Sequence, residues 1–545
     1  MSKFYSNVYS RGEYLYHRYF ENNKDKIEKI QMQPWYFLHC NHETGYQDIY
    51  GNNVQRFDFN SVKEYRDNRR LMIDANQEVL GQENLELLYL ADLYPGVVNF
   101  DPSKLRIASI DIETVSKNGF PYPNEAKEEI DAISHIDSIT GDIWLFSTRK
   151  WDRNKSTLSK EILTRAKYKY FNSEQEMLLD YLTYWKSNYP HIVTGWNIDN
   201  YDIQYMVNRY NKLFGEKVTS NFSPFGFIGY RIAEGSSTDD EFPEKTYSFA
   251  GIAILDYLAL YKKFRITARS SYKLDFIAEL ELGENKLEYD GPLWKLAEED
   301  PQRYCDYNIQ DTLLIEKLDN KLKFLLLAVS LSYYSHINFE KVLSPVTTWD
   351  GIIFNSLLKQ DKIVPMKRSH PKETYVGAYV KEPKIGMRYG WIVSDDLTSL
   401  YPSIVRQWNI SPETIAGRTD YYSVEKYLNK EVKTSTEYAQ AANGMLYRKD
   451  KRGIIPIEIE KVFFQRKHHK NNEFFAKKVN ELIELSIKLY DKLPDDLDLY
   501  CFDYVELSEQ EIQSKISNMS KEDMSNAYKL IEKDFGILNK FIEIE

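Results

Sequence analysis

The sequence is poor in cysteine and has no long apolar run. Its 545 residues include three cysteines, Cys40, Cys305 and Cys501, at unrelated spacings. Such spacing forms neither a disulfide framework nor the paired ligands of a zinc site, which indicates a reducing compartment. The longest apolar run, residues 324–329, is too short to span a bilayer, and residues 1–20 lack the apolar region of a signal peptide. We therefore expect a soluble, cytoplasmic protein without membrane contact.

An excess of basic residues is also missing. The chain has 71 Lys and Arg against 82 Asp and Glu, a net charge of −11. This balance is weak evidence against a protein that binds nucleic acid through one broad basic face, but it is compatible with an enzyme whose sites are carboxylate clusters. The chain is 42% apolar, and its length corresponds to about three domains at about 100–200 residues each. Its 43 tyrosines either provide stacking surfaces for unpaired bases or reflect codon composition.

The first acidic cluster lies in a predicted strand. Residues 107–110 are apolar enough for a buried strand, and the alternation of side chains places Asp111 and Glu113 on one face with Ile112 on the other. Two acids on one face repel each other unless a cation lies between them. The pattern therefore indicates a metal site, although by itself it also fits a solvated edge strand.

Two further acidic clusters follow. A predicted strand at 191–196 leads into a helix that opens with Asp202, at a strand-to-helix junction where catalytic acids of α/β folds commonly lie. Residues 303–318 are predicted to form one helix, on which Tyr307 and Asp311 share a face. Each pattern alone also fits an ordinary helix. Together with the strand acids, they supply the four carboxylates of a two-metal nuclease and a phenol that orients the attacking water.

Another acid follows a second apolar segment, in WIVSDDLTSLYPS. Residues 391–393 predict a buried strand that ends at Asp395 and Asp396. One carboxylate rarely holds Mg²⁺ for phosphoryl chemistry, because such sites use two ions and several hard oxygen ligands. A partner for this acid is therefore required.

At this point the chain resembles a known family. DIET, the block that ends in Asp202 and the Tyr-x-x-x-Asp of residues 307–311 are similar to the three exonuclease motifs of family B DNA polymerases, and DLTSLYPS resembles their first polymerase motif. VGAYVKEP, NISPETIAG and KVFFQRKHHK resemble the replicative polymerases of tailed bacteriophages. The likeness extends from the N-terminus to about residue 510.

The resemblance implies a 3′–5′ exonuclease in the first half of the chain. Two Mg²⁺ or Mn²⁺ ions would be held by Asp111, Glu113, Asp202 and Asp311. Tyr307 would help to place the hydrolytic water, and nucleotides would leave from a DNA 3′ end. Residues 229–248 have the pattern of a hairpin with a long polar tip, which in the family helps to move the primer end between sites. A surface loop without that role is the alternative.

The resemblance also implies a polymerase site with two ions. Asp396 would be its metal ligand, assisted by the carbonyl of Leu397, and Tyr401 would lie beneath the deoxyribose of the dNTP. The backbone that receives the triphosphate would be that of Ser399, Leu400 and Tyr401. Arg466 and Lys470 are four apart on a helix predicted from about Pro456, so both would face the triphosphate. QRKHHK also fits a solvated basic face.

Two motifs of the family are missing from the sequence: a finger helix with a Lys and an Asn-Ser-Leu-Tyr-Gly-like segment, and an Asp-Thr-Asp hairpin. LPDDLDLYCFDY is no substitute, because Pro494 interrupts it and it has no hairpin glycine. We therefore expect a naturally split polymerase, in which a second polypeptide provides the partner of Asp396. A premature stop or an engineered fragment is the alternative. The other expected partners are a DNA primer-template, a single-stranded 3′ end, a dNTP and a sliding clamp contacted through the second polypeptide.

The expected fold is a multidomain α/β and α+β protein. Its predicted parts are an N-terminal domain (1–103, returning at 326–367), an RNase H-like exonuclease (104–325), a partial palm (368–452) and partial helical fingers (453–545). We expect the exonuclease-bearing subunit of a split DNA polymerase in the cytoplasm of a phage-infected bacterium. The alternatives are a stand-alone 3′–5′ exonuclease whose palm only binds DNA, and a DNA-binding scaffold without activity. The intact nucleotide-site residues favour the first, because a lone exonuclease does not need a triphosphate site.

Overall fold

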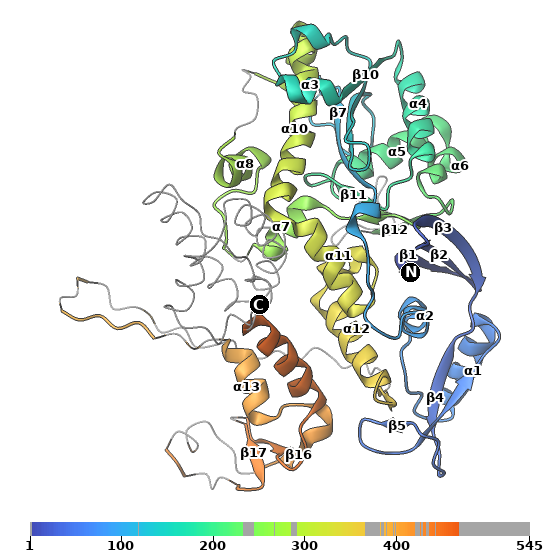
Figure 1. Ribbon diagram of the computed structural model, residues 1–545, viewed down its shortest axis with the longest axis vertical. Helices are drawn as coiled ribbons and strands as arrows, with labels where there is room; N and C mark the ends of the chain where they lie inside the picture. The colour runs from blue at the N-terminus through green and yellow to red at the C-terminus, as the bar shows by residue number, and fades with distance from the viewer. Residues whose placement is uncertain are drawn as a thin grey trace, which may run out of the picture.

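A mixed sheet covered by helices on both faces forms one end of the molecule, and an N-terminal sheet lies beside it (Figure 1). The computed structural model describes residues 3–117, 119–232, 245–265, 267–284 and 291–365, and then 382, 386–387, 390–395, 397, 399–419, 426, 429–431, 435–441 and 443–467. No helix in this part of the chain is long and apolar enough to cross a membrane.

The mixed sheet has six strands in the order β10-β9-β8-β7-β11-β14. These strands are β7 (Ile107–Thr114), β8 (Ile130–Asp137), β9 (Ile143–Ser147), β10 (Ala166–Tyr170), β11 (Ile192–Thr194) and β14 (Ala253–Ile254). Strand β8 runs antiparallel to both β7 and β9, whereas β11 runs parallel to β7, and β14 runs parallel to β11. The order fits the expected RNase H-like fold, and β7 lies at its centre.

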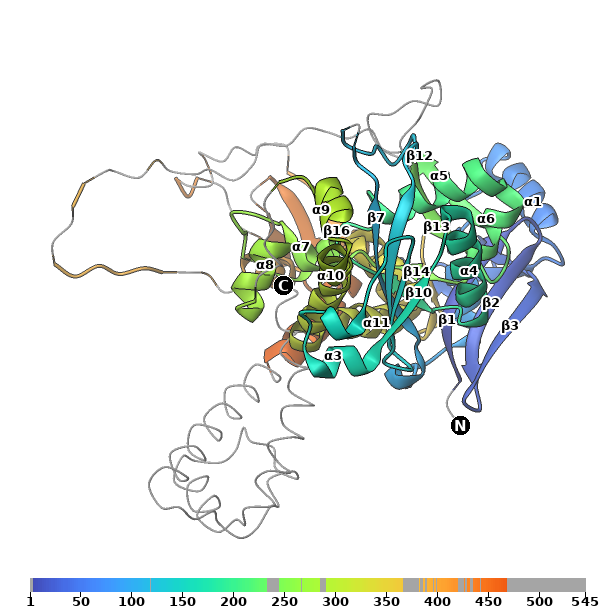
Figure 2. The ribbon, with the colours of Figure 1, turned by 90° about the horizontal axis from the view of Figure 1, so that it is seen from above.

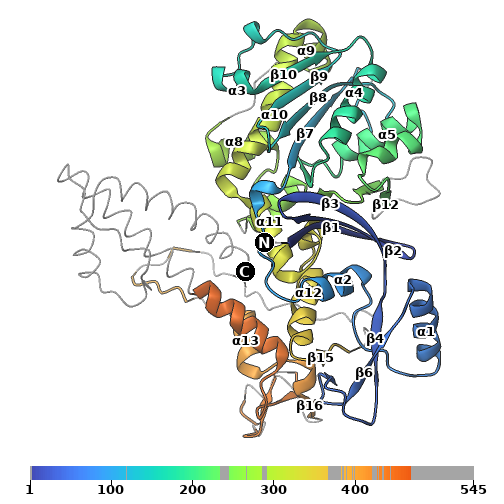
Figure 3. The ribbon, with the colours of Figure 1, turned by 45° about the vertical axis from the view of Figure 1, so that its right-hand side comes forward.

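Helices cover both faces of this sheet (Figure 3). On one face lie α4 (Glu174–Ser187) and α5 (Asp202–Phe214), whose buried aromatic and aliphatic side chains share a core with Ile110 and Ile112. The other face packs against α10 (Pro301–Leu322), through Tyr304, Ile309 and Leu313. Three shorter helices pack beside the same sheet: α3 (Lys160–Arg165), α6 (Glu216–Thr219) and α9 (Leu293–Glu299). Helices α7 (Tyr257–Phe264) and α8 (Leu274–Leu282) pack instead into the core of the N-terminal region. Because both faces are covered, the acids at the end of β7 have fixed surroundings.

The predicted hairpin near residues 229–248 is present. Strands β12 (Ile228–Ile232) and β13 (Lys245–Phe249) pair antiparallel. Its tip, 233–244, lies outside the described residues. The function expected for this hairpin therefore stays a prediction.

The N-terminal region forms a second core with a later pair of helices. Its elements are β1 (Lys3–Arg11), β2 (Tyr14–Glu21), β3 (Lys24–Gln31), β4 (Trp35–His39), β5 (Gln47–Asp48), β6 (Val54–Asp58), α1 (Val62–Asp74) and α2 (Leu85–Leu93). Helices α11 (Phe324–Ser335) and α12 (Pro345–Leu358) pack into the same core, and β15 (Lys362–Ile363) pairs with β5. Tyr5 donates to the Ile337 carbonyl at 2.8 Å, and Asn338 donates to the Val8 carbonyl at 2.7 Å. These contacts agree with the predicted return at 326–367, while the domain boundaries themselves stay predictions.

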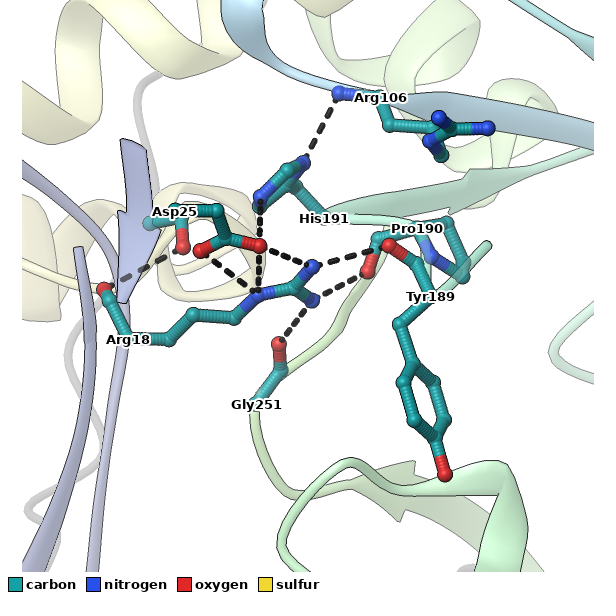
Figure 4. A network of polar contacts seen from close by, with 8 residues as sticks. Arg18, Asp25, Arg106, Tyr189, Pro190, His191 and Gly251 are labelled. Atoms are coloured by element: carbon teal, nitrogen blue, oxygen red, sulfur yellow. Dashed lines mark hydrogen bonds and ion pairs between the residues drawn. The ribbon is translucent and has the colours of Figure 1, made fainter. Parts of the chain in front are cut away.

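A buried polar network joins the N-terminal sheet to the mixed sheet (Figure 4). Arg18, on β2, is 2% exposed and donates to Asp25 at 2.8 Å. Its guanidinium also donates to the backbone carbonyls of Tyr189, Pro190 and Gly251. His191 lies 3.1 Å from Asp25 and accepts the Arg106 backbone N–H at 2.9 Å. Burial, and next the positive charge of Arg18, lower the pKa of His191 to about 4, so the imidazole is neutral at pH 7.

Part of the segment with the predicted polymerase residues is exposed, unlike the packed sheets of the N-terminal region and the predicted exonuclease. The buried strand predicted at 391–393 is wrong: Trp391, Ile392 and Val393 are not in a strand and are 102%, 76% and 80% exposed. A strand needs a neighbour to accept its hydrogen bonds, and no strand of the described residues pairs with this segment. Asp396, Lys470 and the predicted finger residues 468–545 lie outside the described residues.

Some structure follows the exposed segment (Figure 1). Helix α13 (Leu400–Trp408) has no buried residue, and β16 (Ile415–Arg418), β17 (Tyr438–Gln440) and β18 (Met445–Arg448) form a small sheet. Residues 454–467 are helical, which confirms the helix predicted from about Pro456. The partial palm and fingers therefore stay a prediction, supported only by these separate elements.

Candidate active site

The structure brings the predicted strand, junction and helix acids to one place. Strand β7 carries Asp111 and Glu113 and lies between α5, which begins at Asp202, and α10, which carries Asp311 (Figure 3). The backbone N–H of Ile112 donates to Asp202 at 3.0 Å, which joins β7 to α5. All three predicted elements, each identified by its pattern, are confirmed as neighbours.

The turn before Asp202 is fixed by a close approach and a buried acid. A Cβ on Gly195 would lie 2.5 Å from the Ile110 carbonyl, so only glycine allows the end of β11 to pack on β7 here. Asn197 has a φ of 63°, a conformation that asparagine tolerates. Asp256 accepts the backbone N–H groups of Asn197 at 3.1 Å and Asp199 at 3.3 Å. The turn therefore delivers Asp202 to β7 in one orientation.

Asp256 is a residue that the sequence analysis missed. It is 2% exposed and also caps α7 by accepting the N–H groups of Leu258 and Ala259. Its sequence pattern, an apolar strand that ends in an acid before a helix, is the same pattern that identified Asp202. That repetition would have been sufficient to find it.

The acids of the site are protonated more easily than isolated carboxylates. Burial, and then the neighbouring Asp256 and Asp311, raise the pKa of Asp202 to about 7, against the hydrogen bond from Ile112. Burial, and then Asp256, likewise raise the pKa of Asp199 to about 7. Burial is therefore the main cause of both raised pKa values, and the negative charge of neighbouring carboxylates, which a bound cation would offset, adds to it.

The donor set fits a hard divalent cation, since carboxylate oxygens are the ligands that Mg²⁺ and Mn²⁺ prefer. No three Asp, Glu, His or Cys side chains of the described residues form a ready metal cluster. Asp111 accepts from Asn308 at 2.6 Å and Asp202 accepts from the backbone N–H of Ile112, so hydrogen bonds orient these two carboxylates. By their chemistry and charge the acids fit divalent cations.

Helix α10 is locked in rotation by buried acids that the sequence analysis also missed. Asp306 is fully buried and accepts from Trp151 and Ser156, each at 2.7 Å. Tyr304, one turn before Asn308, donates to Asp131 at 2.5 Å. With that face fixed to the sheet, Tyr307 is half-buried and Asp311 is buried one turn later. In the sequence these acids have no distinguishing spacing, so no pattern could have separated them from surface residues.

Asn308 is the missed residue nearest to the predicted ligands. It is fully buried, and its amide donates to a carboxylate oxygen of Asp111 at 2.6 Å. An amide donor neither adds nor removes charge, so it orients the carboxylate without neutralising it. Asn308 therefore holds one predicted ligand in place.

An open cleft of about 600 Å³ lies beside Glu113. One wall comes from the loop after β7 and the other from the start of α9. The lining residues are Glu113, Thr114, Ser116, Lys117, Gly119, Phe120, Pro121, Tyr201, Pro292, Leu293 and Trp294. The cleft is large enough for a small organic ligand and opens directly onto a predicted metal ligand.

The predicted polymerase residues are not organised in this way. Leu397, Leu400 and Tyr401 are 69%, 43% and 74% exposed. Ser399 has a φ of 50° and precedes α13, while Arg466 lies in the helix 454–467. With Asp396 and Lys470 outside the described residues, nothing in the structure tests the roles predicted for this group.

Comparison with known proteins gives two family matches. The family model described as "DNA polymerase family B, exonuclease domain" matches residues 51–277, and the model described as "DNA polymerase family B" matches residues 345–484. The first match includes Asp111, Glu113 and Asp202, and Asp311 lies between the two matches.

Individual relatives match most of the chain. The DNA-directed DNA polymerase of Escherichia phage RB69 is 38% identical over 96% of this chain and 60% of its own length. That of Enterobacteria phage T4 is 41% identical over 88% of this chain and 55% of its own length. The DNA polymerase delta catalytic subunit of Candida albicans is 24% identical over 71% of this chain. The chain thus spans 60% and 55% of the two phage relatives.

Proposed function

We propose that the chain is a member of family B of the DNA polymerases, because its residues 51–277 and 345–484 match the two models of that family, and that it removes nucleotides from DNA 3′ ends by two-metal hydrolysis. The observation that supports this activity is the gathering of acids from β7, α5 and α10, with the pKa of Asp202 raised to about 7 by burial and by neighbouring carboxylates. Such a site has the charge that a nuclease needs before its cations bind.

The roles proposed for the residues follow from their positions. The ions would be held by Asp111, Glu113, Asp202 and Asp311. The chemistry supplied by bound Mg²⁺ or Mn²⁺ would be activation of the attacking water and stabilisation of the leaving oxygen. Tyr307 would orient that water, and Asn308 keeps Asp111 aimed at the site through its 2.6 Å hydrogen bond.

We also propose that the later segment contributes part of a DNA polymerase site. The residues concerned are Asp396, Leu397, Ser399, Leu400, Tyr401, Arg466 and Lys470. A polypeptide that corresponds to the rest of the phage relatives would complete this site, and we propose that it acts as a separate chain and contacts a sliding clamp. Primer-template DNA and a dNTP would bind only to the completed site.

A stand-alone exonuclease is the second candidate. The observation that favours it is the exposure of Tyr401 and Trp391, while the acids on β7, α5 and α10 lie between packed elements. The two candidates share the exonuclease chemistry and differ only in the use of the later segment.

The experiment uses the purified chain with single-stranded DNA labelled at its 5′ end. With Mg²⁺ we expect a ladder of products shortened from the 3′ end, and with EDTA we expect none. Glu113→Gln should remove the activity while DNA binding persists. Shortening from the 5′ end, or an inactive chain with both Mg²⁺ and Mn²⁺, would overturn the proposal.

A second assay separates the two candidates. Primer extension should be absent for the chain alone and present once the complementing polypeptide is added. In that mixture, Tyr401→Val should raise incorporation of ribonucleotides relative to deoxyribonucleotides, because the ring would no longer crowd a 2′-hydroxyl. If the complementing polypeptide produces no synthesis, the stand-alone exonuclease is the better description.

A further inference from the structure

The cleft beside Glu113 is lined by aromatic rings on both of its walls. Phe120 lies in the loop after β7, and its ring centroid is 5.9 Å from that of Tyr201. Tyr201 is itself fixed, because its hydroxyl lies 2.8 Å from that of Thr114 on β7. Trp294, at the start of α9, lines the same cleft from a part of the chain far away in sequence. Figure 2 shows α9 beside β7.

The charges of the cleft do not favour recognition of phosphate groups. Among its lining residues the only cation is Lys117, and that ammonium is paired with Glu298 of α9. The chain as a whole has a net charge of −11. A ligand made mainly of phosphates would therefore gain little here. A flat, uncharged aromatic group suits the ring-lined walls better.

The ion pair of Lys117 with Glu298 also connects the two walls. Lys117 follows β7 and Glu298 lies one turn after Trp294 on α9. The side chains are 49% and 39% exposed, so the contact orients α9 more than it stabilises the fold. Trp294 is half-buried in this arrangement and lines the cleft.

We propose that Trp294 is the platform on which the unpaired base at the DNA 3′ end stacks, opposite the aromatic wall formed by Phe120 and Tyr201. The proposal rests on the exonuclease function and specifies which part of the substrate the cleft recognises: the base, not the phosphate. Base stacking is tolerant of sequence because every base has an aromatic face. An enzyme that recognises the end in this way accepts all four terminal bases and disfavours an end that has none.

The test measures binding of fluorescent single-stranded DNA to the intact chain in EDTA, so that hydrolysis does not interfere. Trp294→Ala should weaken binding about 5- to 150-fold, the range for one stacked base. Trp294→Phe should restore most of the affinity, and Lys117→Met should weaken binding less than about fivefold. Tyr50→Ala removes a ring that is 59% exposed on the N-terminal region and should leave binding unchanged.

A substrate without the terminal base provides the matched control. An oligonucleotide that is abasic at its 3′-terminal position should bind the wild-type chain at least as weakly as ordinary DNA binds Trp294→Ala, because it loses the contacts of the base with both walls. Trp294→Ala should weaken binding of the abasic oligonucleotide no further. An abasic position at the 5′ end should have no effect. The comparison of the ordinary and abasic oligonucleotides on the wild-type chain needs no variant, so it tests the proposal even if Trp294→Ala is unstable.

The outcomes separate the platform from the exonuclease function. Equal affinities for the ordinary and 3′-abasic ends would overturn the platform, whether or not the chain degrades DNA. Binding that depends on Trp294 and on the terminal base, in a chain inactive with Mg²⁺ and Mn²⁺, would support the platform and refute the exonuclease. Loss of affinity for Trp294→Ala with both oligonucleotides alike would also overturn it, because the ring would then act on something other than the base.

Discussion

The acids on β7, α5 and α10 and the segment around Tyr401 contrast in their surroundings. Asp202 and Asp311 are 4% and 6% exposed, and they lie where two hydrophobic cores meet across the mixed sheet. Tyr401 is 74% exposed on a helix without a buried residue. Sequence motifs predicted a site in both regions, but among the described residues the side chains are organised only where neighbouring elements pack on them.

The largest difference between the two regions should concern their acids. Asp111→Asn should lower the exonuclease rate by more than about 100-fold, the upper end for a residue that only supports a metal ligand. Asp395→Asn, an exposed acid of the later segment, should leave the rate unchanged. The measurement is release of mononucleotides from single-stranded DNA with Mg²⁺. Comparable losses for both substitutions would break the contrast.

Two tryptophans test the packing side of the comparison. Trp185 is fully buried on α4, and Trp185→Ala should lower the free energy of unfolding by about 3–5 kcal/mol. Trp391, which is 102% exposed, should change stability by less than about 0.5 kcal/mol in the same substitution. Denaturant unfolding followed by circular dichroism gives both values. A large loss for Trp391→Ala would mean that its segment packs in solution.

Two buried asparagines sharpen the comparison further. Asn308→Leu removes the donor to Asp111 and should lower exonuclease activity and Mn²⁺ affinity about 10- to 100-fold. Asn409, 5% exposed, donates to the carbonyls of Arg448 and Lys451 at 2.7 and 2.8 Å. Asn409→Leu should weaken the later segment and leave Mn²⁺ affinity of the exonuclease unaltered, as calorimetric titration would show. Equal Mn²⁺ affinities in the two variants would remove Asn308 from the site.

The smallest effect concerns pH and the network of Figure 4. The pKa of His191 is about 4 in the folded chain, below the value of about 6.5 for an unfolded histidine. The neutral imidazole therefore contributes stability that is present above pH 6.5 and lost as the pH falls towards 4. The groups facing it are Arg18, Asp25 and Arg106. Between pH 7 and pH 4.5, the Tm of the wild-type chain should fall further than that of His191→Gln, and parallel falls would contradict this assignment.

The sequence was sufficient to predict the strand and the helices that carry the proposed acids of the exonuclease. Alternation predicted that Asp111 and Glu113 share a strand, and four-residue spacing predicted a common helix for Tyr307 and Asp311; both elements are confirmed. Asp306 and Asn308 were missed, because their roles depend on the tertiary partners Trp151 and Asp111 rather than on local spacing. Asp256 was missed although it follows an apolar strand and precedes a helix, which is a local signal.

The wrong prediction of a buried strand at residues 391–393 also has a physical cause. Trp391, Ile392 and Val393 have the composition of a buried strand, but burial depends on a neighbouring strand and a facing helix. An apolar composition allows a segment to be buried, but the elements that lie next to it in the fold determine whether it is buried. The same reasoning explains why β11, with only three residues, is a strand: it lies between β7 and β14.

The most direct test of the account is a single exonuclease assay with two variants, Asp202→Ala and Asp396→Ala. We predict that Asp202→Ala is inactive on single-stranded DNA with Mg²⁺, because it loses a proposed metal ligand between β7 and α5. We also predict that Asp396→Ala shortens DNA from the 3′ end at the wild-type rate, because its segment belongs to a different site. Activity in Asp202→Ala, or equal loss in both variants, would contradict the account.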